Sequence, residues 1–330
     1  MCDMKNLYTK WSGCLLLGIL MILVKPSDVR AQDPEFTQFY ANHLYLNPAF
    51  AGTHGCPRFN LNYRNQWPAL SGTFVTSSVS YDQYIKSVSG GIGSMVTNDM
   101  SGQGTINHTT GSLIYSYHLA LNRKWSMLFG AQATWNQKFL DWDKLTFGDQ
   151  IDPRRGFIYQ TGDVPRGGSR GFFDVSAGML IFNKNFYAGF VAKHLNTPNE
   201  SMIIGDSRMP MRFTAHMGAN IEFGQRSQYN NQTSLSPNII WSYQQGFMQT
   251  NVGLYVKYGV FTTGVWFRDR DAFIVLIGLN TGKFRFGYSY DLTVSKLTNA
   301  SGGSHELSLG FNLTCREKPR SFRTISCPSF

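Results

Sequence analysis

The chain has 330 residues, of which 15% are charged and 15% are aromatic, and it carries a formal net charge of +10. The charged fraction is well below the roughly 25% of an ordinary soluble domain, and with so many aromatic residues it argues against a disordered chain or a helical enzyme. Low charge, many aromatic side chains and 33 glycines are typical of a membrane β-barrel with aromatic girdles and tight turns.

The first 31 residues have the features of a secretory signal peptide. Lys5 and Lys10 precede an apolar run at residues 14–24, and a polar stretch ends at Ala31. The apolar run is much shorter than the about 20 residues that a membrane-spanning helix needs. We expect cleavage after Ala31, which assigns residues 1–31 to the signal peptide.

Removal of this peptide leaves a net charge of +8. The basic residues are scattered rather than gathered in a run. Together with the export signal, this argues against nucleic acid as a partner and favours lipid headgroups or other envelope proteins. Residues 32–57 then form a polar segment with a turn at Asn47-Pro48.

Alternation of apolar and polar residues is the main signal along the rest of the chain, because it places successive side chains on opposite faces of a strand. In residues 211–223, Phe213 lies on one face while Arg212, His216 and Glu222 share the other. Such a strand fits lipid on one side and a polar interior on the other. We expect about fourteen strands, near residues 58–66, 73–82, 88–98, 108–119, 124–138, 171–182, 185–195, 211–223, 234–244, 248–258, 260–268, 271–280, 283–291 and 304–313.

The lengths of the connections predict an orientation. The longest expected links, 139–170 and 196–210, follow odd-numbered strands, whereas the links after even-numbered strands are short except for 224–233. Outer-membrane barrels have long extracellular loops and short periplasmic turns. We therefore expect an all-β, antiparallel outer-membrane barrel at residues 58–314, with both termini in the periplasm and a periplasmic tail at 315–330.

Three cysteines remain after the expected cleavage, at positions 56, 315 and 327. Three are too few for a disulfide scaffold. Cys56 precedes the first expected strand and Cys315 follows the last, and these strands are neighbours in a closed barrel. A Cys56–Cys315 bridge, a Cys315–Cys327 bridge and unpaired thiols are all open readings for the oxidising periplasm.

No residues have the spacing of a catalytic or metal site. No Gly-x-Ser-x-Gly nucleophile elbow appears, because the one stretch with this spacing, residues 167–171, leads into an expected strand and not into a helix. We interpret the inward-facing His216 and Ser289 as hydrogen-bonding groups of the lumen, with a hydrolase at the barrel rim as a third hypothesis. The loop at 141–152 is acidic but lacks the spacing of a calcium site. We predict no enzyme, no cofactor and no metal ion.

Several charged residues fall on the inward face of the expected strands. They would line a water-filled pore, or they would form a cross-strand network that closes the barrel with residues 32–57 as its plug; charge alone does not choose between these readings. The candidate network consists of Arg212, His216, Glu222, Lys283, Arg285, Asp291 and Glu306, and Arg64, Lys138, Asp174 and Lys257 also face inward.

Five blocks of the sequence carry a family resemblance. Residues 33–40 (DPEFTQFY) and 46–52 (LNPAFAG) resemble the N-terminal signature of the PorP/SprF family. Residues 63–67 (YRNQW) resemble its next block, and residues 286–291 (FGYSYD) and 304–308 (SHELS) resemble its C-terminal blocks. The blocks stand in the family's order and at similar spacing, whereas the basic tail falls outside the resemblance.

The resemblance implies an outer-membrane component of the type IX secretion system of Bacteroidota, which exports proteins with C-terminal targeting domains. Its implied partners are a periplasmic ring lipoprotein, a companion ring protein, a peptidoglycan-binding envelope protein and exported cargo. It supplies no catalytic residues. Because the second block precedes the barrel and needs no lipid face, Asn47, Pro48, Ala49 and Gly52 are candidates for a partner contact or a plug. The alternative is a stand-alone channel for small solutes.

Overall fold

The computed structural model describes residues 33–70, 72–145, 147–152, 154–162, 168–202, 205–223, 233–294 and 301–314. The expected signal peptide and the tail at 315–330, with Cys315 and Cys327, lie outside these residues. Within the described ranges, no helix has the length and apolar character needed to cross a bilayer.

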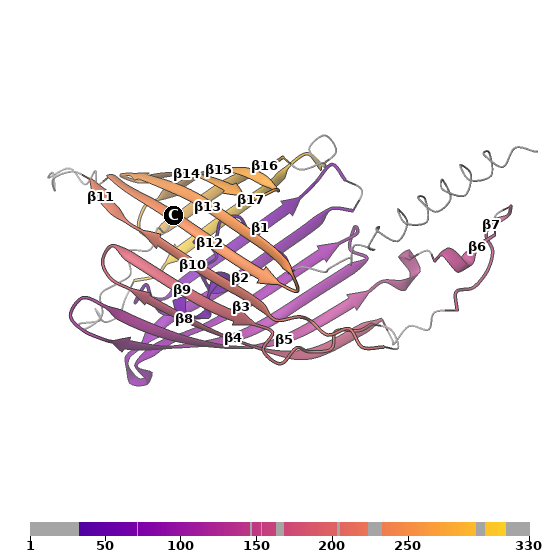
Figure 1. Cartoon of the computed structure of the whole chain (residues 1–330), viewed down its shortest axis with the longest axis horizontal. Helices are drawn as coiled ribbons and strands as arrows, with labels where there is room; N and C mark the ends of the chain where they lie inside the picture. Colours follow the sequence, from indigo (N-terminus) through magenta and orange to yellow (C-terminus); the bar gives the residue numbers. More distant parts are fainter. Residues whose placement is uncertain are drawn as a thin grey trace, which may run out of the picture. The chain divides into compact units, whose positions relative to one another are not determined.

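The described chain folds mainly as one antiparallel sheet (Figure 1). Its strands are β1 (Arg58–Gln66), β2 (Phe74–Ile85), β3 (Gly90–Ser101), β4 (Ile106–Ala120), β5 (Ser126–Leu140), β8 (Ser169–Phe182), β9 (Phe186–Lys193), β10 (Arg212–Ala219), β11 (Ile221–Phe223), β12 (Thr233–Gln244), β13 (Phe247–Tyr258), β14 (Phe261–Arg268), β15 (Ala272–Asn280), β16 (Phe284–Thr293) and β17 (Ser304–Asn312). The other elements are α2 (His43–Leu46), the 3-10 turns η1 (Pro48–Phe50), η2 (Lys86–Val88), η3 (Trp142–Lys144) and η4 (Gly148–Gln150), and the hairpin of β6 (Ile151–Asp152) and β7 (Gly156–Phe157).

The sheet closes on itself, since β1 pairs with both β2 and β17 while β10 pairs with both β9 and β12. β10 and β11 are two parts of one strand, because both pair with β12 in a continuous register. That register places Pro237 of β12 opposite Ala219, next to the break at Asn220. Proline has no N–H to donate, which accounts for the break.

With β10 and β11 counted together, the 15 strands of the sheet make a fourteen-stranded barrel. The prediction of a closed antiparallel barrel with about fourteen strands is therefore confirmed. The expected strands coincide with the observed ones, and their ends differ by no more than three residues. This agreement reflects the strength of the period-two pattern in strands that have two different faces.

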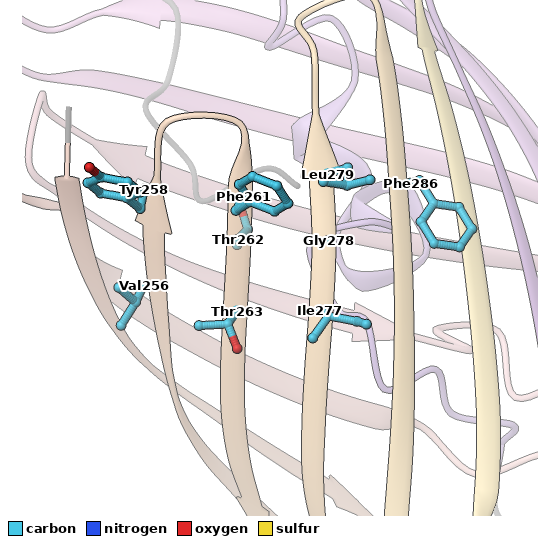
Figure 2. A pocket seen from close by; sticks show the side chains of 9 residues that line it. All are labelled: Val256, Tyr258, Phe261, Thr262, Thr263, Ile277, Gly278, Leu279 and Phe286. Carbon is cyan, nitrogen blue, oxygen red and sulfur yellow. The ribbon is translucent and has the colours of Figure 1, made fainter. Parts of the chain in front are cut away.

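The outward face of the barrel carries rows of large apolar side chains. The register pairs Tyr258 with Phe261, Phe261 with Leu279, and Leu279 with Phe286 across β13 to β16, and Figure 2 shows these four side chains along neighbouring strands. Beside this row the small side chain of Thr263 helps to leave a groove of about 370 Å³. An exterior of aromatic and aliphatic rows suits contact with lipid acyl chains.

The two ends of the barrel are named here by their strands. At the loop end, β1 ends at Gln66 and β17 begins at Ser304. At the tail end, β1 begins at Arg58 and β17 ends at Asn312. Every strand of the barrel runs between these two ends, so each contact of the interior can be assigned a depth.

Residues 34–57 lie inside the barrel, and we call them the lumen segment. Its side chains form much of the buried apolar core: Leu44 and Ala49 are 0% exposed. The rings of Phe39 and Trp266, the latter from β14, lie 4.9 Å apart. The interior is therefore partly apolar, whereas the alternation predicted a polar one.

The lumen segment crosses the barrel from one end to the other. Glu35 contacts Arg212, the first residue of β10, at the loop end, and the segment joins β1 at Arg58, at the tail end. The described start of the segment and the end of β17 at Asn312 thus lie at opposite ends of the barrel. The expectation that both termini are periplasmic concerns residues outside the described ranges, and it did not allow for a single crossing before β1.

Cys56, the second-to-last residue of the lumen segment, is disulfide-bonded. Every other cysteine of the chain lies outside the described residues. Of the readings left open by the sequence, an unpaired Cys56 is therefore wrong.

Candidate functional site

The candidate site is the interior of the barrel where the wall holds the lumen segment. Three groups of contacts hold it: a charged cluster toward the loop end, a track of small residues toward the middle and tail end, and a second charged cluster at the tail end. Each group is built from strands far apart in the sequence, so only the closed barrel brings its members together.

In the loop-end cluster, four charged side chains from β1, β14, β16 and β17 surround Thr37. The guanidinium of Arg64 lies 2.8 Å from the carboxylate of Asp291 and 3.3 Å from that of Glu306, and Arg268 lies 3.5 Å from Asp291. All four charged residues are at most 3% exposed. Buried charges are tolerated when they are paired and hydrogen-bonded, and here two cations face two anions.

The lumen segment completes this cluster. The backbone N–H groups of Thr37 and Gln38 donate to the Glu306 carboxylate over 2.5 and 3.1 Å. The Thr37 hydroxyl donates to Asp291 over 2.8 Å and accepts a hydrogen bond from Arg64. Because Arg64 and Glu306 belong to β1 and β17, the two strands that close the barrel, residues 37 and 38 bridge the closing seam.

Glu35 extends the same cluster toward the loop end. Its carboxylate accepts a hydrogen bond from Arg212 over 2.6 Å and lies 4.0 Å from Arg268. Both arginines stand at the loop-end limits of their strands, β10 and β14. The segment is therefore held by ion pairs from the point at which it enters the lumen.

Around the turn η1, the wall offers positions with little or no side chain. The register aligns Ser116, Gly130 and Gly178 side by side on β4, β5 and β8. A Cβ atom at Gly130 would lie 2.3 Å from the backbone nitrogen of Ala49, and one at Gly178 would lie 2.3 Å from Oδ1 of Asn47. We call these three residues the small-residue track, and the segment fits against it because the glycines leave room.

Asn47 fixes the turn against this track. Its Oδ1 accepts the N–H of Ala49 over 2.9 Å, which caps η1, and Pro48 follows at the first position of the turn. Its Nδ2 donates to the carbonyl of Met179 over 3.0 Å and lies 3.1 Å from Nε2 of His216. One side chain thus sets the local backbone and ties it to two strands.

The tail-end cluster is centred on Asp82, which is 0% exposed. Arg58 donates two hydrogen bonds of 2.9 Å to its carboxylate, and the backbone N–H of Gly52 donates a third of 2.9 Å. His43 lies 3.4 Å from the same carboxylate. Burial, assisted by the Arg58 guanidinium, lowers the pKa of His43 from 6.5 to about 4, so this histidine is neutral at pH 7.

Gly52 has a second constraint beside its bond to Asp82. Its φ of +73° lies in the left-handed region, which favours glycine. A Cβ atom at this position would also lie 2.5 Å from the Cα of Gly91. Glycine is therefore required here both by the backbone conformation and by the close approach of β3.

The structure places the four candidate residues of the N-terminal block inside the barrel, where all of them are buried. Asn47 and Ala49 are 0% exposed, and Pro48 and Gly52 lie in the same buried stretch. None of these four side chains reaches the surface of the described structure.

The candidate lumen network is divided by the structure. Asp291 and Glu306 share Arg64, as described above. Arg212, His216 and Arg285 are inward and buried, but each has a different partner in the interior; these partners are Glu35, Asn47 and Asn60 respectively. The network of the sequence is thus several separate groups: Arg212 and His216 contact the lumen segment, whereas Arg285 bonds to Asn60 of β1.

Glu222 and Lys283 do not belong to any of these groups. Glu222, at the tail-end limit of its strand, pairs at 3.3 Å with Lys184, and both side chains are largely exposed. Lys283 is exposed in the turn between β15 and β16. Alternation assigned both to the inward face, but at the end of a strand the inward direction opens to solvent.

The sequence interpretation missed Arg58, Asp82 and Arg268 as members of the charged clusters. The alternation that places Arg64 inward also places Arg58 inward, so this signal was present. No comparable signal exists for Thr37 and Gln38, because the segment that carries them has no regular period.

The two residues considered for a hydrolase, His216 and Ser289, have different surroundings. Nε2 of His216 faces Asn47, and its ring stacks on Phe50 with centroids 5.5 Å apart. The Ser289 hydroxyl, on β16, has no hydrogen-bond partner within the described ranges. Within the same ranges, no three His, Cys, Asp or Glu side chains gather as a metal site would require.

A closed barrel of fourteen antiparallel strands with an apolar exterior defines an outer-membrane β-barrel protein. A family model described as "Type IX secretion system membrane protein PorP/SprF" matches residues 29–311. The chain therefore belongs to the PorP/SprF family of type IX secretion system membrane proteins. Among curated protein sequences, none matches the chain.

Three solved structures are similar to the chain at low sequence identity. The toluene transporter TodX of P. putida is 10% identical, with a TM-score of 0.46 over 82% of this chain and 93% of its own. A FadL homologue of Pseudomonas aeruginosa is 10% identical, with a TM-score of 0.45 over 82% and 93%. Omp33 of Acinetobacter baumannii is 10% identical, with a TM-score of 0.41 over 79% and 100%. At these values we take nothing about function from the likeness.

Proposed function

We propose that the chain serves type IX secretion as a non-enzymatic barrel with a closed lumen, which docks periplasmic components or exported cargo at the outer membrane. The observation that carries this proposal is the occupation of the lumen by residues 34–57. The buried face of this segment reaches strands on every side of the barrel, from β1 to β17.

Opening the lumen would require the contacts between the lumen segment and the barrel wall to be broken. Displacing the segment would expose apolar side chains such as Phe50 and Leu44, each worth about 2–3 kcal/mol of burial. It would also strip Glu306 of its backbone donors and leave Asp82 without the Gly52 N–H. These costs favour a plug over a solute channel, which was the alternative reading of the inward charges.

The same burial bears on the two readings of Asn47, Pro48, Ala49 and Gly52. A partner in the periplasm cannot contact side chains that the barrel wall already covers. We therefore propose these residues as the seat of the plug and place partner contacts on the exposed ends of the barrel. Membership of the PorP/SprF family supports partners within the secretion system: a periplasmic ring lipoprotein and its companion, a peptidoglycan-binding protein, or cargo with a C-terminal targeting domain.

Co-purification from native envelopes tests the docking role. We expect a tagged chain to recover ring or anchoring proteins after mild cross-linking, and deletion of the gene to stop export of cargo. The matched control is an unrelated outer-membrane barrel with the same tag. Recovery of the folded chain without any secretion-system protein, with export intact in the deletion strain, would contradict the docking role.

Planar-bilayer recording tests the closed lumen separately. The purified chain is expected to give no stable conductance, since the lumen segment fills the interior. A stable open pore in the wild-type protein would overturn the closed lumen and favour the small-solute channel. The two experiments fail independently, because a docking protein with an open lumen would pass the first and not the second.

A further inference from the structure

A groove lies on the outward face of the barrel over β13 to β16, close to the tail end (Figure 2). Its volume of about 370 Å³ is within the range of about 300–1,000 Å³ that small-molecule sites have. Toward the tail end it is bounded by a row of large side chains, in which Tyr258, Phe261, Leu279 and Phe286 follow one another across the four strands. The hollow is therefore part of the surface that faces lipid.

A small side chain makes the floor of the groove. In the next row of the outward face, Thr263 stands between Val256 and Ile277. The Thr263 hydroxyl donates to the carbonyl of Leu276 over 3.1 Å. Its polar atom is thus satisfied by the backbone of the wall, and it adds no unpaired hydroxyl to a surface in contact with hydrocarbon. A threonine between two larger apolar neighbours leaves an apolar hollow.

Aromatic rings beside the groove indicate its depth in the membrane. One row nearer the tail end, Phe284 lies 5.5 Å from Phe311 and Phe59 lies 4.7 Å from Tyr81, measured between ring centroids. The register places Phe311 opposite Phe59, so these rings form one belt across β16, β17, β1 and β2. Aromatic belts mark the boundary between acyl chains and headgroups. The groove lies one row deeper, at the level of the acyl chains.

The turns at the tail end carry basic charges alone. The described turns of this end are 86–89, 121–125, 183–185, 259–260 and 281–283. They contain no acidic residue, and their basic residues, all exposed, are Lys86, Arg123, Lys124, Lys184 and Lys283. The described links of the loop end, in contrast, contain the acidic residues Asp141, Asp143, Asp149, Asp152, Glu200, Asp206, Asp269 and Asp271. The end of the barrel beside the groove therefore favours an anion.

One of these basic residues lies next to the groove. The turn with Lys283 joins β15 to β16, and so connects Leu279 to Phe286, two residues that line the groove. Lys283 is three residues from Phe286, or about 10 Å along the strand. Since barrel strands are tilted, this distance corresponds to the headgroup layer of a bilayer, which is about 5–8 Å thick on each side. A phosphate above the groove would thus lie at the level of the Lys283 ammonium group.

We propose that the groove binds one phospholipid, with an acyl chain over Thr263 between Phe261 and Ile277 and with its phosphate at Lys283. Within a bilayer the acyl chains are as apolar as the wall, so van der Waals packing and the headgroup decide where a lipid stays. A chain in the groove contacts a floor and a rim, whereas a chain on a smooth wall contacts one side only. The short turns place this end on the periplasmic side of an outer-membrane barrel, where the leaflet consists of phospholipid.

Native mass spectrometry of the folded protein, stripped of lipid in detergent and then given dioleoyl phosphatidylglycerol, tests the site. We expect the wild type to retain a single lipid, and Thr263→Trp, whose indole fills the groove, to retain none. Val265→Trp is the matched control and should bind as the wild type does. Val265 lies on the same strand and face as Thr263, is 56% exposed and does not line the groove.

The headgroup contact is tested on the same protein. Lys283→Gln should weaken binding about fivefold, which is the contribution of one lysine near an anionic lipid surface. Lys124→Gln, in another turn of the tail end, should leave binding unchanged. Dioleoylglycerol, which has the same acyl chains and no phosphate, should bind the wild type more weakly than the phospholipid does. Heat-modifiable migration in gels confirms that each variant is folded before it is compared.

Four results would overturn the proposal. Equal retention by wild type and Thr263→Trp would show that the lipid does not occupy the groove, and equal loss in both tryptophan variants would show a general effect of an added indole. Equal binding of the two dioleoyl probes would remove the phosphate from the site. Recovery of lipid A in place of phospholipid from native membranes would assign the groove to the other leaflet. Secretion is not measured in any of these tests, so their failure is distinct from a failure of the docking role.

Discussion

The two halves of the lumen segment are held in different ways. Residues 35–38 are held by side chains of the wall, since the carboxylates and guanidinium groups of five strands converge on them. Residues 47–50 fit where the wall lacks side chains, since Gly130 leaves room for the backbone of Ala49 and Gly178 leaves room for the side chain of Asn47. Binding of the first half depends on paired charges in the wall, and binding of the second depends on wall positions that carry no side chain.

This difference has a consequence for mutation. A charged cluster can lose one partner while keeping its shape, so its loss costs pairing energy. At Gly130, by contrast, an added Cβ atom would collide with the backbone of the lumen segment, which cannot rotate away as a side chain can. Substitutions in the two halves should therefore differ in how much stability they remove and in which second substitution restores it.

The largest effect is expected at the small-residue track. A Gly130→Val substitution puts a Cβ atom 2.3 Å from the nitrogen of Ala49, and it should destabilise the barrel by about 4 kcal/mol or more, beyond ordinary overpacking. Urea unfolding followed by heat-modifiable migration in gels measures this. The matched control is Gly111→Val on β4, where an added Cβ meets nothing within 4 Å. Equal stability of the two variants would refute the close approach.

A smaller loss is expected at the loop-end cluster. The Glu306→Gln substitution keeps the size of the side chain but removes the charge that faces Arg64 and the N–H groups of Thr37 and Gln38. We expect a loss of about 3 kcal/mol, because a buried partner is left unpaired. Glu222→Gln is the control, since its exposed pair with Lys184 is worth less than about 1 kcal/mol. A loss at Glu222 as large as that at Glu306 would contradict the placement of these two acids.

The capping side chain of the second half should come next. Asn47→Ala removes the acceptor of the Ala49 N–H and the donor to Met179, and we expect a loss of about 2 kcal/mol. Asn47→Ser should recover part of it, because serine also caps a helical turn. Unfolding midpoints of the three proteins would rank them wild type, serine, alanine. A serine variant no better than alanine would show that the cap contributes little.

The last effect depends on pH and concerns His43. Its pKa is about 4 in the folded chain and near 6.5 when unfolded, so only the unfolded state takes up a proton as the pH falls below 6.5. The stability that is complete above pH 6.5 is therefore lost as the pH approaches 4, by about 1.4 kcal/mol per pH unit. The charged groups that face this histidine are Asp82, Arg58 and Arg285.

The His43→Gln variant isolates this contribution, because other groups that titrate in the same range are common to both proteins. The difference in unfolding free energy between wild type and variant should shrink between pH 7 and pH 5. A difference that stays constant over this range would show that His43 is protonated equally in both states.

The strands of the barrel could be predicted from the sequence, but few of the contacts in its interior could. Strands such as β14 alternate between exposed and buried side chains along their whole length. The number, order and bounds of the strands could therefore be predicted. The plug could only be named as one of two readings, since residues 34–57 have no period and their contacts come from strands up to 270 residues away. Glu222 shows the limit of alternation, which gives the face of a residue but not its depth.

The family blocks gain a physical meaning from their contacts. The Asn-Pro-Ala stretch matches a capped turn that needs Gly130 and Gly178 opposite it. Asp291 and Glu306, which stand in the two C-terminal blocks, bind Thr37 and Gln38 of the first block. Blocks that lie at opposite ends of the sequence thus recognise each other inside the barrel.

The bridge made by residues 37 and 38 also constrains the order of folding. A filled lumen cannot be threaded after closure, so the segment must already lie along the nascent wall when β1 meets β17. The Thr37 to Glu306 bond joins residues 269 positions apart, and contacts of such high sequence separation form late and slowly. Closure of the sheet and seating of the segment should therefore be one kinetic event. The last strand, β17, then pairs with β1 only when the lumen segment is in place.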